Sequence, residues 1–142
     1  MTVVDASVAV KWLFPEPGAA QAQALLDSGE TIQAPGLVRT EVAGAVSRKA
    51  RHGEIEPADA GLAFQLWQRI LSCLSVIVVP DESDLARGFA ISLAIGHPLQ
   101  DCLYLALAER LQADFVTADA RFESKARTVY GRVRLLAPAA AG

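Results

Sequence analysis

The stretch Thr2-Val-Val-Asp5-Ala-Ser7-Val-Ala-Val-Lys11-Trp12-Leu13 decides the fold, because its pattern changes at one acidic residue. Before Asp5 the residues are β-branched, which favours a short buried strand over Thr2–Val4. After Asp5 the sequence predicts a helix over Ala6–Phe14, which the following prolines end. A buried strand that leads directly into a helix is typical of a parallel α/β unit.

The alternation of short apolar strands and helices continues along the chain, and it predicts a parallel sheet with helices on both faces. The length of 142 residues suits a single domain over 1–142. Further strands are expected over 31–34, 75–79, 115–117 and 133–136. Further helices are expected over 19–26, 37–51, 56–74 (with Trp67 on its core face), 83–95, 99–111 and 120–126, and the Ala-Pro tail is expected to fray.

The composition, 52% apolar and 20% charged, predicts a folded protein with a substantial core. The apolar runs are short, such as Val76–Val79, whereas a membrane helix needs about 20 apolar residues, so no membrane span is expected. The N-terminus shows no secretory pattern, and a cytoplasmic protein is expected. Cys73 and Cys102 fall in apolar helical patterns and are expected to be small buried hydrophobes, not a disulfide.

The formal net charge of −3 at first argues against a nucleic-acid partner. The net charge changes from −3 to +1 if four acids that are candidate metal ligands are left out of the sum. The positive charges also form two clusters, for which solvated faces and helix C-terminal charges are the alternative interpretation. The clusters are Arg48, Lys49, Arg51 and His52 at one helix end, and Arg121, Lys125, Arg127, Arg132 and Arg134, opposed only by Glu123.

Two acids lie where a helix should be apolar. On a helical wheel Glu41 falls inside the apolar arc that includes Val38 and Val42. Burial of a lone carboxylate is costly, so Glu41 needs a partner such as a cation or an arginine, unless it reaches solvent. Asp101 lies in the first turn of a nearly all-apolar helix, where the helix dipole alone also favours an acid.

Two further acids, Asp5 and Asp119, each follow a strand and precede a helix. Taken singly, each is explained as a helix N-cap. In a parallel sheet, however, ligands bind at the carboxyl ends of the strands, and one acidic pocket there would explain all four acids together. Asp114 should lie at the opposite end of its strand and is excluded from this pocket.

Carboxylate oxygens suit Mg²⁺ or Mn²⁺, whereas zinc prefers histidine or cysteine at ligand spacing. The chain offers no such spacing, and His52 and His97 are expected to be structural or on the surface. Ser7 and Thr117 add hydroxyls beside Asp5 and Asp119, suited to hydrogen-bond a carboxylate or a metal-bound water. The sequence has neither a Gly-rich phosphate loop nor an HExxH pair. Metal-dependent hydrolysis of phosphodiesters is therefore the leading hypothesis.

Four segments, taken in order, resemble the motifs of PIN-domain ribonucleases, especially the VapC-type toxins of toxin–antitoxin pairs. The likeness spans nearly the whole chain, and the four motifs together are specific. The segments are Val3–Leu13 (VVDASVAVKWL), Pro35–Glu41 (PGLVRTE), Pro98–Glu109 (PLQDCLYLALAE) and Val116–Phe122 (VTADARF).

The resemblance implies a three-layer α/β/α sandwich, a PIN domain, around a parallel sheet of about five strands. It implies a Mg²⁺- or Mn²⁺-dependent endoribonuclease that forms a homodimer and is neutralised by a cognate VapB-like antitoxin. The implied substrate is RNA, with tRNA or rRNA loops as targets. The implied acidic site is Asp5, Glu41, Asp101 and Asp119, and the basic groups expected to hold the RNA backbone are Lys11, Arg48 and Arg121.

Three alternatives were considered. A haloacid-dehalogenase-like phosphatase needs Asp-x-Asp after its first strand, but Ser7 takes the second position. A receiver domain needs a lysine after its fifth strand, where this chain has Leu-Leu-Ala-Pro. A non-catalytic PIN-like module that binds RNA or a partner is the third, and the presence of all four acids argues against it.

Overall fold

The structure is a computed structural model that describes residues 1–136, so the Ala-Pro tail expected to fray lies outside the described residues. The strands are β1 (Thr2–Val4), β2 (Ile32–Pro35), β3 (Ile77–Val79), β4 (Asp114–Thr117) and β5 (Val133–Leu135). The α-helices are α1 (Ala6–Ala9), α2 (Ala19–Asp27), α3 (Val38–Arg51), α4 (Pro57–Ser72), α5 (Leu85–Ile95), α6 (Leu99–Leu111) and α7 (Ala120–Ala126). Two short 3₁₀ helices are η1 (Val10–Trp12) and η2 (Asp81–Asp84).

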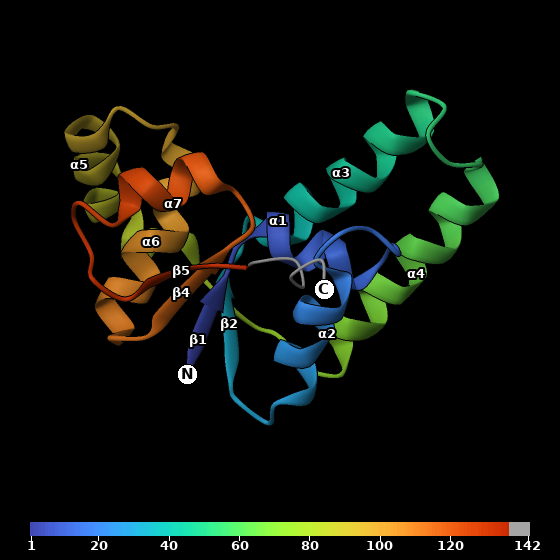
Figure 1. The fold of residues 1–142 in the computed structure, drawn as a ribbon, viewed down its shortest axis with the longest axis horizontal. Coiled ribbons are helices and arrows are strands. Elements are labelled where there is room, and N and C mark those ends of the chain that lie inside the picture. The colour runs from blue at the N-terminus through green and yellow to red at the C-terminus, as the bar shows by residue number, and fades with distance from the viewer. Residues whose placement is uncertain (137–142) are drawn as a thin grey trace, which may run out of the picture.

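The five strands form one parallel sheet in the order β3-β2-β1-β4-β5. From β1 the chain moves outward to β2 and β3, then crosses back to β4 and β5. Because parallel crossovers are right-handed, this reversal places the early and late helices on opposite faces. Figure 1 shows α5, α6 and α7 on one side of the sheet and α2, α3 and α4 on the other. The three-layer α/β/α sandwich predicted from the sequence is confirmed.

Helix α6 forms the centre of the core. Every residue from Cys102 to Ala108 is buried, and the helix contacts β1, β2 and β4. This surrounding explains why the segment is apolar on nearly every side. Because α6 begins at the carboxyl edge of the sheet, its first turn delivers Asp101 to that edge.

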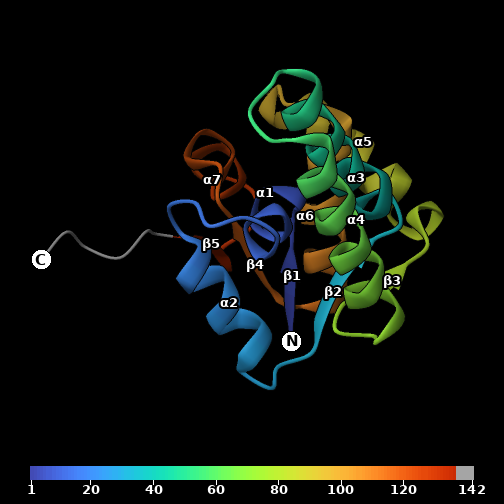
Figure 2. The same ribbon diagram turned by 90° about the vertical axis from the view of Figure 1, so that its right-hand side faces the viewer.

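Helices α3 and α4 lie side by side and extend away from the sheet (Figures 1 and 2). Trp67 of α4 is 1% exposed, as expected for a core residue. Its indole N–H donates to the carbonyl of Arg39 on α3 at 3.2 Å, which fixes one helix against the other.

The helix expected over Ala6–Phe14 is divided in the structure. Helix α1 ends at Ala9, and the chain tightens into η1. The indole N–H of Trp12 donates to the carbonyl of Ala22 at 2.8 Å, so η1 is held against α2. A tertiary hydrogen bond of this kind is not visible in the local pattern.

The prediction that both cysteines are buried is wrong for Cys73. Cys102 is buried, but Cys73 is exposed at the end of α4. The next residue, Leu74, has a left-handed φ of 55° and turns the chain away from the helix. The helix therefore ends before Cys73 can reach the core.

Within residues 1–136, no single helix is long and apolar enough to cross a membrane. In the same range, the consecutive helices Asp81–Ile95 and Leu99–Leu111 together have the length and apolar composition of a span, but they are bent by 117°.

Arg110→Ala is expected to lower the free energy of unfolding by about 2–4 kcal/mol, because it leaves a buried carboxylate without its partner. Asp84 of η2 is 2% exposed, and the Arg110 guanidinium of α6 donates to both its oxygens, at 2.7 and 3.0 Å. Arg87→Ala is the matched control, because it breaks a more exposed two-point pair with Glu109 and should cost less than about 1 kcal/mol. Urea unfolding measures the free energy of unfolding that each variant loses. Equal losses would contradict a larger contribution from the buried Asp84–Arg110 pair.

Candidate active site

The four candidate acids lie at the carboxyl edge of the sheet. Strands β1 and β4 are neighbours, with Val4 opposite Val116, so Asp5 and Asp119 follow the ends of adjacent strands. Asp101 comes from the first turn of α6, and Glu41 from the first turn of α3. Asp114 lies at the other end of β4, opposite Thr2, so its exclusion from this edge was correct.

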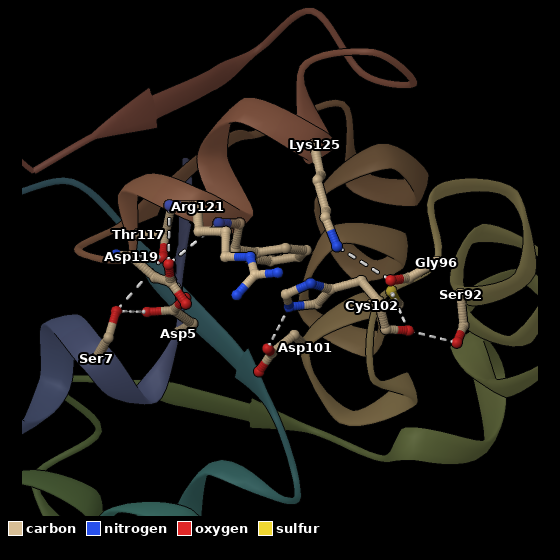
Figure 3. Close-up of polar contacts among 12 residues, drawn as sticks. Asp5, Ser7, Ser92, Gly96, Asp101, Cys102, Thr117, Asp119, Arg121 and Lys125 are labelled. Carbon is tan, nitrogen blue, oxygen red and sulfur yellow. Dashed lines mark hydrogen bonds and ion pairs between the residues drawn. The ribbon is translucent and has the colours of Figure 1, made fainter.

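Asp5 is the most enclosed of the four, at 5% exposed. The hydroxyl of Ser7 donates to its Oδ1 and the hydroxyl of Thr117 to its Oδ2 (Figure 3), which confirms the expected hydroxyl–carboxylate contacts. The amide of Val8 also donates to Oδ1, at 3.3 Å. The pKa of Asp5 is raised to about 6, mainly by burial; the Ser7 and Thr117 hydroxyls and the Val8 amide oppose the rise, and the charge of Asp101 adds to it.

Glu41 is half-buried and bound by a partner that the sequence interpretation did not anticipate. The hydroxyl of Tyr104 donates to its Oε1 at 2.6 Å. Tyr104 lies three residues after Asp101 on α6 and is fully buried. Burial raises the pKa of Glu41, the tyrosine bond opposes the rise, and the charges of Asp101 and Asp81 add to it. Glu41 is thus compensated by a tyrosine, neither by an arginine nor by solvent alone.

Asp101 is bound by His97, which sequence reasoning treated as structural or as a surface residue. The two side chains meet at 2.6 Å between Nε2 and Oδ2, and because a carboxylate only accepts, the imidazole N–H donates. The ring stacks on Phe122 of α7, with centroids 4.4 Å apart and planes at 17°. Lys125 of α7 donates to the carbonyl of Gly96 at 3.0 Å, so this hydrogen bond joins α7 to the turn before α6 (Figure 3). The spacing of His97, four residues before Asp101, was the only sequence signal.

Asp119 is exposed and caps α7. Its Oδ1 accepts the amides of Arg121 and Phe122, at 3.0 and 3.1 Å. Asp5 likewise caps α1 through Val8. The N-cap interpretation is therefore correct for both residues, and it is compatible with a second role, because Oδ2 of Asp119 points to no donor within residues 1–136.

A cavity of about 430 Å³ lies beside Asp119, the one member of the four acids that lines it, and its walls carry three lysine and arginine side chains. Ser7 and Asp119 line one part of it, and Lys11 and Arg48, two of the three expected RNA contacts, line another. Arg121 does not line this cavity. Its side chain extends from α7 toward the space between Asp5 and Asp101 in Figure 3.

The second basic cluster is less free than its sequence indicates. Arg132 and Arg134 both pair with Asp114, at 2.9 and 3.5 Å, at the far end of β4. Arg127 pairs with Glu123 at 2.6 Å. The interpretation that only Glu123 opposes this cluster is wrong, because the parallel pairing of β4 and β5 brings Asp114 to it.

The four carboxylates have the chemistry that a hard cation prefers, although the structure does not bring them together into a complete set of ligands. Within residues 1–136, no three histidine, cysteine, aspartate or glutamate side chains form a ready-made metal cluster. The charge of Asp101 nevertheless raises the pKa values of both Asp5 and Glu41, so Asp101 repels each of the other two carboxylates. A divalent cation among them would relieve that repulsion, and carboxylate oxygens are the donors that Mg²⁺ and Mn²⁺ prefer.

Comparison with known proteins agrees with this architecture. The family model described as PIN domain matches residues 2–128. VapC ribonuclease Mb0985 of Mycobacterium bovis is 35% identical over 121 residues, covering 85% of this chain and 87% of the relative. Ribonuclease VapC3 of Pyrobaculum aerophilum is 28% identical over 124 residues, covering 87% and 92%.

Two solved structures share the fold. The crystal structure of PAE2754 from Pyrobaculum aerophilum matches with a TM-score of 0.71 at 22% identity, covering 95% of this chain and 83% of that chain. A toxin–antitoxin complex from Klebsiella pneumoniae matches with a TM-score of 0.67 at 14% identity, covering 97% and 99%. At these identities, the likeness extends to the fold.

Asp5→Asn is expected to raise the free energy of unfolding at neutral pH in metal-free buffer. The folded protein holds the Asp5 proton more tightly than the unfolded chain, since the pKa rises from 3.8 to about 6. Protonated Asp5 thus contributes to the free energy of unfolding below about pH 4. This contribution, at most about 3 kcal/mol, is lost as the pH rises through about 6. Asparagine has no charge to bury, so its advantage should grow between those pH values and then level off.

Urea unfolding of wild type and variant across this pH range checks the sign. Asp114→Asn serves as the control, because Asp114 is only partly buried and is paired with two arginines, so its loss should give no gain. An advantage of Asp5→Asn that does not change with pH would contradict the assigned cause.

Proposed function

This chain belongs to the PIN-domain family, and we propose that it is a metal-dependent endoribonuclease, the toxin of a toxin–antitoxin pair. The observation that carries the proposal is the buried carboxylate of Asp5, with a pKa raised to about 6, beside Asp101 at the carboxyl edge of the sheet. Such a costly group is typical of a functional site. The ribonuclease names of relatives at 35% identity support the same activity.

The proposed cofactor is Mg²⁺ or Mn²⁺, held mainly by Asp5 and Asp101, with Glu41 and Asp119 binding directly or through water. When bound, the ion would supply activation of the attacking water and neutralisation of charge on the phosphate. Three of the acids each use one oxygen for a protein donor: His97 for Asp101, Tyr104 for Glu41, and two α7 amides for Asp119. Within residues 1–136, their second oxygens accept no hydrogen bond, which leaves these oxygens for a cation.

The protein's own groups orient these acids. Ser7 and Thr117 hold both oxygens of Asp5, and both are hydroxyls that can turn when a cation approaches. His97, stacked on Phe122, holds one oxygen of Asp101. Donors of this kind orient metal-binding carboxylates in many proteins.

The proposed substrate is RNA, whose backbone would lie across the basic cavity. Lys11 and Arg48 line this cavity, and Arg121 extends from α7 toward the space between Asp5 and Asp101. These cations would hold phosphates without reading sequence. Exposed bases in tRNA or rRNA loops are the proposed targets, and the cytoplasm is accordingly the proposed location.

The proposed antitoxin would bind an apolar cavity of about 360 Å³ between the segment after η1 and α4. Leu13, Phe14, Leu62 and Leu66 line it, and Leu62 is 64% exposed although it is apolar. The segment Lys11–Glu16 contributes to both this cavity and the basic one. A partner helix in the apolar cavity would therefore extend toward the RNA site and block it.

A homodimer is also proposed. Leu85, Phe89 and Leu93 lie at four-residue spacing on α5 and are 49%, 56% and 71% exposed. An exposed apolar stripe of this kind is typical of an interface. Light scattering gives the mass of the free protein, and a monomer at micromolar concentration would exclude the dimer.

Asp5→Asn and Asp101→Asn are expected to lower Mg²⁺-dependent RNA cleavage by on the order of a hundredfold or more, because each removes a charged donor from the cation site. Cleavage is followed by sequencing of new RNA 5′ ends after induced expression and by gel assay with the purified protein. Asp114→Asn is the matched control at the opposite end of the sheet and should cleave like wild type. Undiminished cleavage in EDTA, or by folded Asp5→Asn protein, would refute the mechanism; metal-independent RNA binding without cleavage would indicate an interaction module.

Leu66→Asp is expected to keep RNA cleavage but weaken inhibition by the antitoxin, since it places a charge in the apolar cavity. The antitoxin to test is the product of a small reading frame immediately upstream. Co-expression with wild type should relieve growth arrest, and co-expression with Leu66→Asp should relieve it poorly. Leu74→Asp changes an equally apolar, 73% exposed residue outside the cavity and should leave inhibition intact. Equal inhibition of both variants would place the antitoxin elsewhere.

A further inference from the structure

The basic cavity contains an internal bridge of three charges. Glu16 accepts from two lysines, with Oε1 at 3.2 Å from Lys11 Nζ and Oε2 at 3.4 Å from Lys49 Nζ. One lysine comes from η1 and the other from the last turns of α3. A single carboxylate therefore sits between two cations that belong to different elements, in a cavity that also holds Arg48.

Both lysines are fixed by more than their pairing with Glu16. Lys11 also donates to the carbonyl of Pro17 at 2.8 Å, and its side chain is only 17% exposed. Gly18 has a φ of 89°, and a Cβ there would lie 3.3 Å from Cδ of Lys11, so this glycine makes room for the lysine stem. Lys49 lies over the ring of Phe14, 5.1 Å from its centroid. The lysines would thus stay in place if Glu16 moved.

We propose that Lys11, Lys49 and Arg48 form a subsite for an RNA backbone phosphate next to the one that is cleaved, and that the Glu16 carboxylate occupies the phosphate position until RNA binds. This inference rests on the proposed ribonuclease function. The cavity that holds the two lysines continues to Ser7 and Asp119, so a strand at the acids would also reach them. A carboxylate bridging two ammonium groups has the charge and the acceptor geometry of a phosphate oxygen pair.

Glu16 is suited to displacement because its side chain is 27% exposed and lies in the segment before α2, outside any helix or strand. Ion pairs at such exposure are weak, so an incoming phosphate has little to overcome. The alternative is that Glu16 serves only to position the lysines. The two roles predict opposite signs: removal of a competitor strengthens RNA binding, whereas removal of a positioning group weakens it.

Glu16→Gln is therefore expected to bind RNA about three- to tenfold more tightly than wild type. Glu54→Gln is the matched control, because Glu54 lines the same cavity and carries the same charge, but its side chain forms no ion pair within residues 1–136. It should tighten binding by less than Glu16→Gln. The probe is a short fluorescein-labelled single-stranded RNA of mixed sequence, and binding is measured by anisotropy in EDTA, where cleavage is not expected.

The salt dependence gives a second readout. In Glu16→Gln the slope of log affinity against log salt should steepen by up to about 0.7, because no displaced carboxylate takes up a cation from solution when the phosphate binds. Lys49→Gln should reduce both affinity and slope. Thermal unfolding of each variant verifies that the fold is retained.

Each outcome bears on the proposal. Tighter binding by Glu16→Gln than by Glu54→Gln supports it, whereas equal tightening, no change or weaker binding overturns it. If wild type cleaves RNA with Mg²⁺ and Glu16→Gln is not tighter, only the subsite is wrong. If wild type neither cleaves nor binds RNA, the proposed function fails together with the subsite.

Discussion

The buried carboxylate of Asp5 is the group around which the carboxyl edge of this sheet is organised. It lies between β1 and α1, and it is held from two sides, by Ser7 on α1 and by Thr117 at the end of β4. These contacts tie the first strand, the first helix and the neighbouring strand into one unit. A charge so enclosed is costly, which is why the pKa of Asp5 rises to about 6. The proposed cation would offset this cost when it binds beside Asp5.

Helix α6 combines packing with chemistry. Its buried face contacts three strands, and its first two turns carry Asp101 and Tyr104 toward Asp5 and Glu41. Asp101 and the tyrosine that binds Glu41 are therefore both positioned by the helix at the centre of the core. The cations, in contrast, come from η1 and the end of α3, which line the cavity, and from α7, which lies outside it. Acids beside a cavity with cations suit the proposed substrate, a backbone phosphate that must be held still while its bond is cut.

Local patterns predicted most elements because each depends on neighbours in sequence. The strand-to-helix change at Asp5, the apolar α6 and the exclusion of Asp114 from the site edge all follow from periodicity and strand direction. Some errors arose where a distant residue decided the outcome. The basic cluster near β5 is partly neutralised because strand pairing brings Asp114 to it. The error for Cys73, in contrast, is local, because this residue lies at the C-cap of α4.

The sequence by itself determined the order of strands and helices and which acids follow a strand, since hydrophobic periodicity and N-cap preference are encoded within a few residues. Only the tertiary structure decided which side chains bind the acids of this region. His97 binds Asp101, Tyr104 binds Glu41 and Glu16 bridges two lysines, and several of these contacts join segments far apart in the chain. The physical reason is that burial and charge interaction depend on distance in space, which sequence spacing does not report.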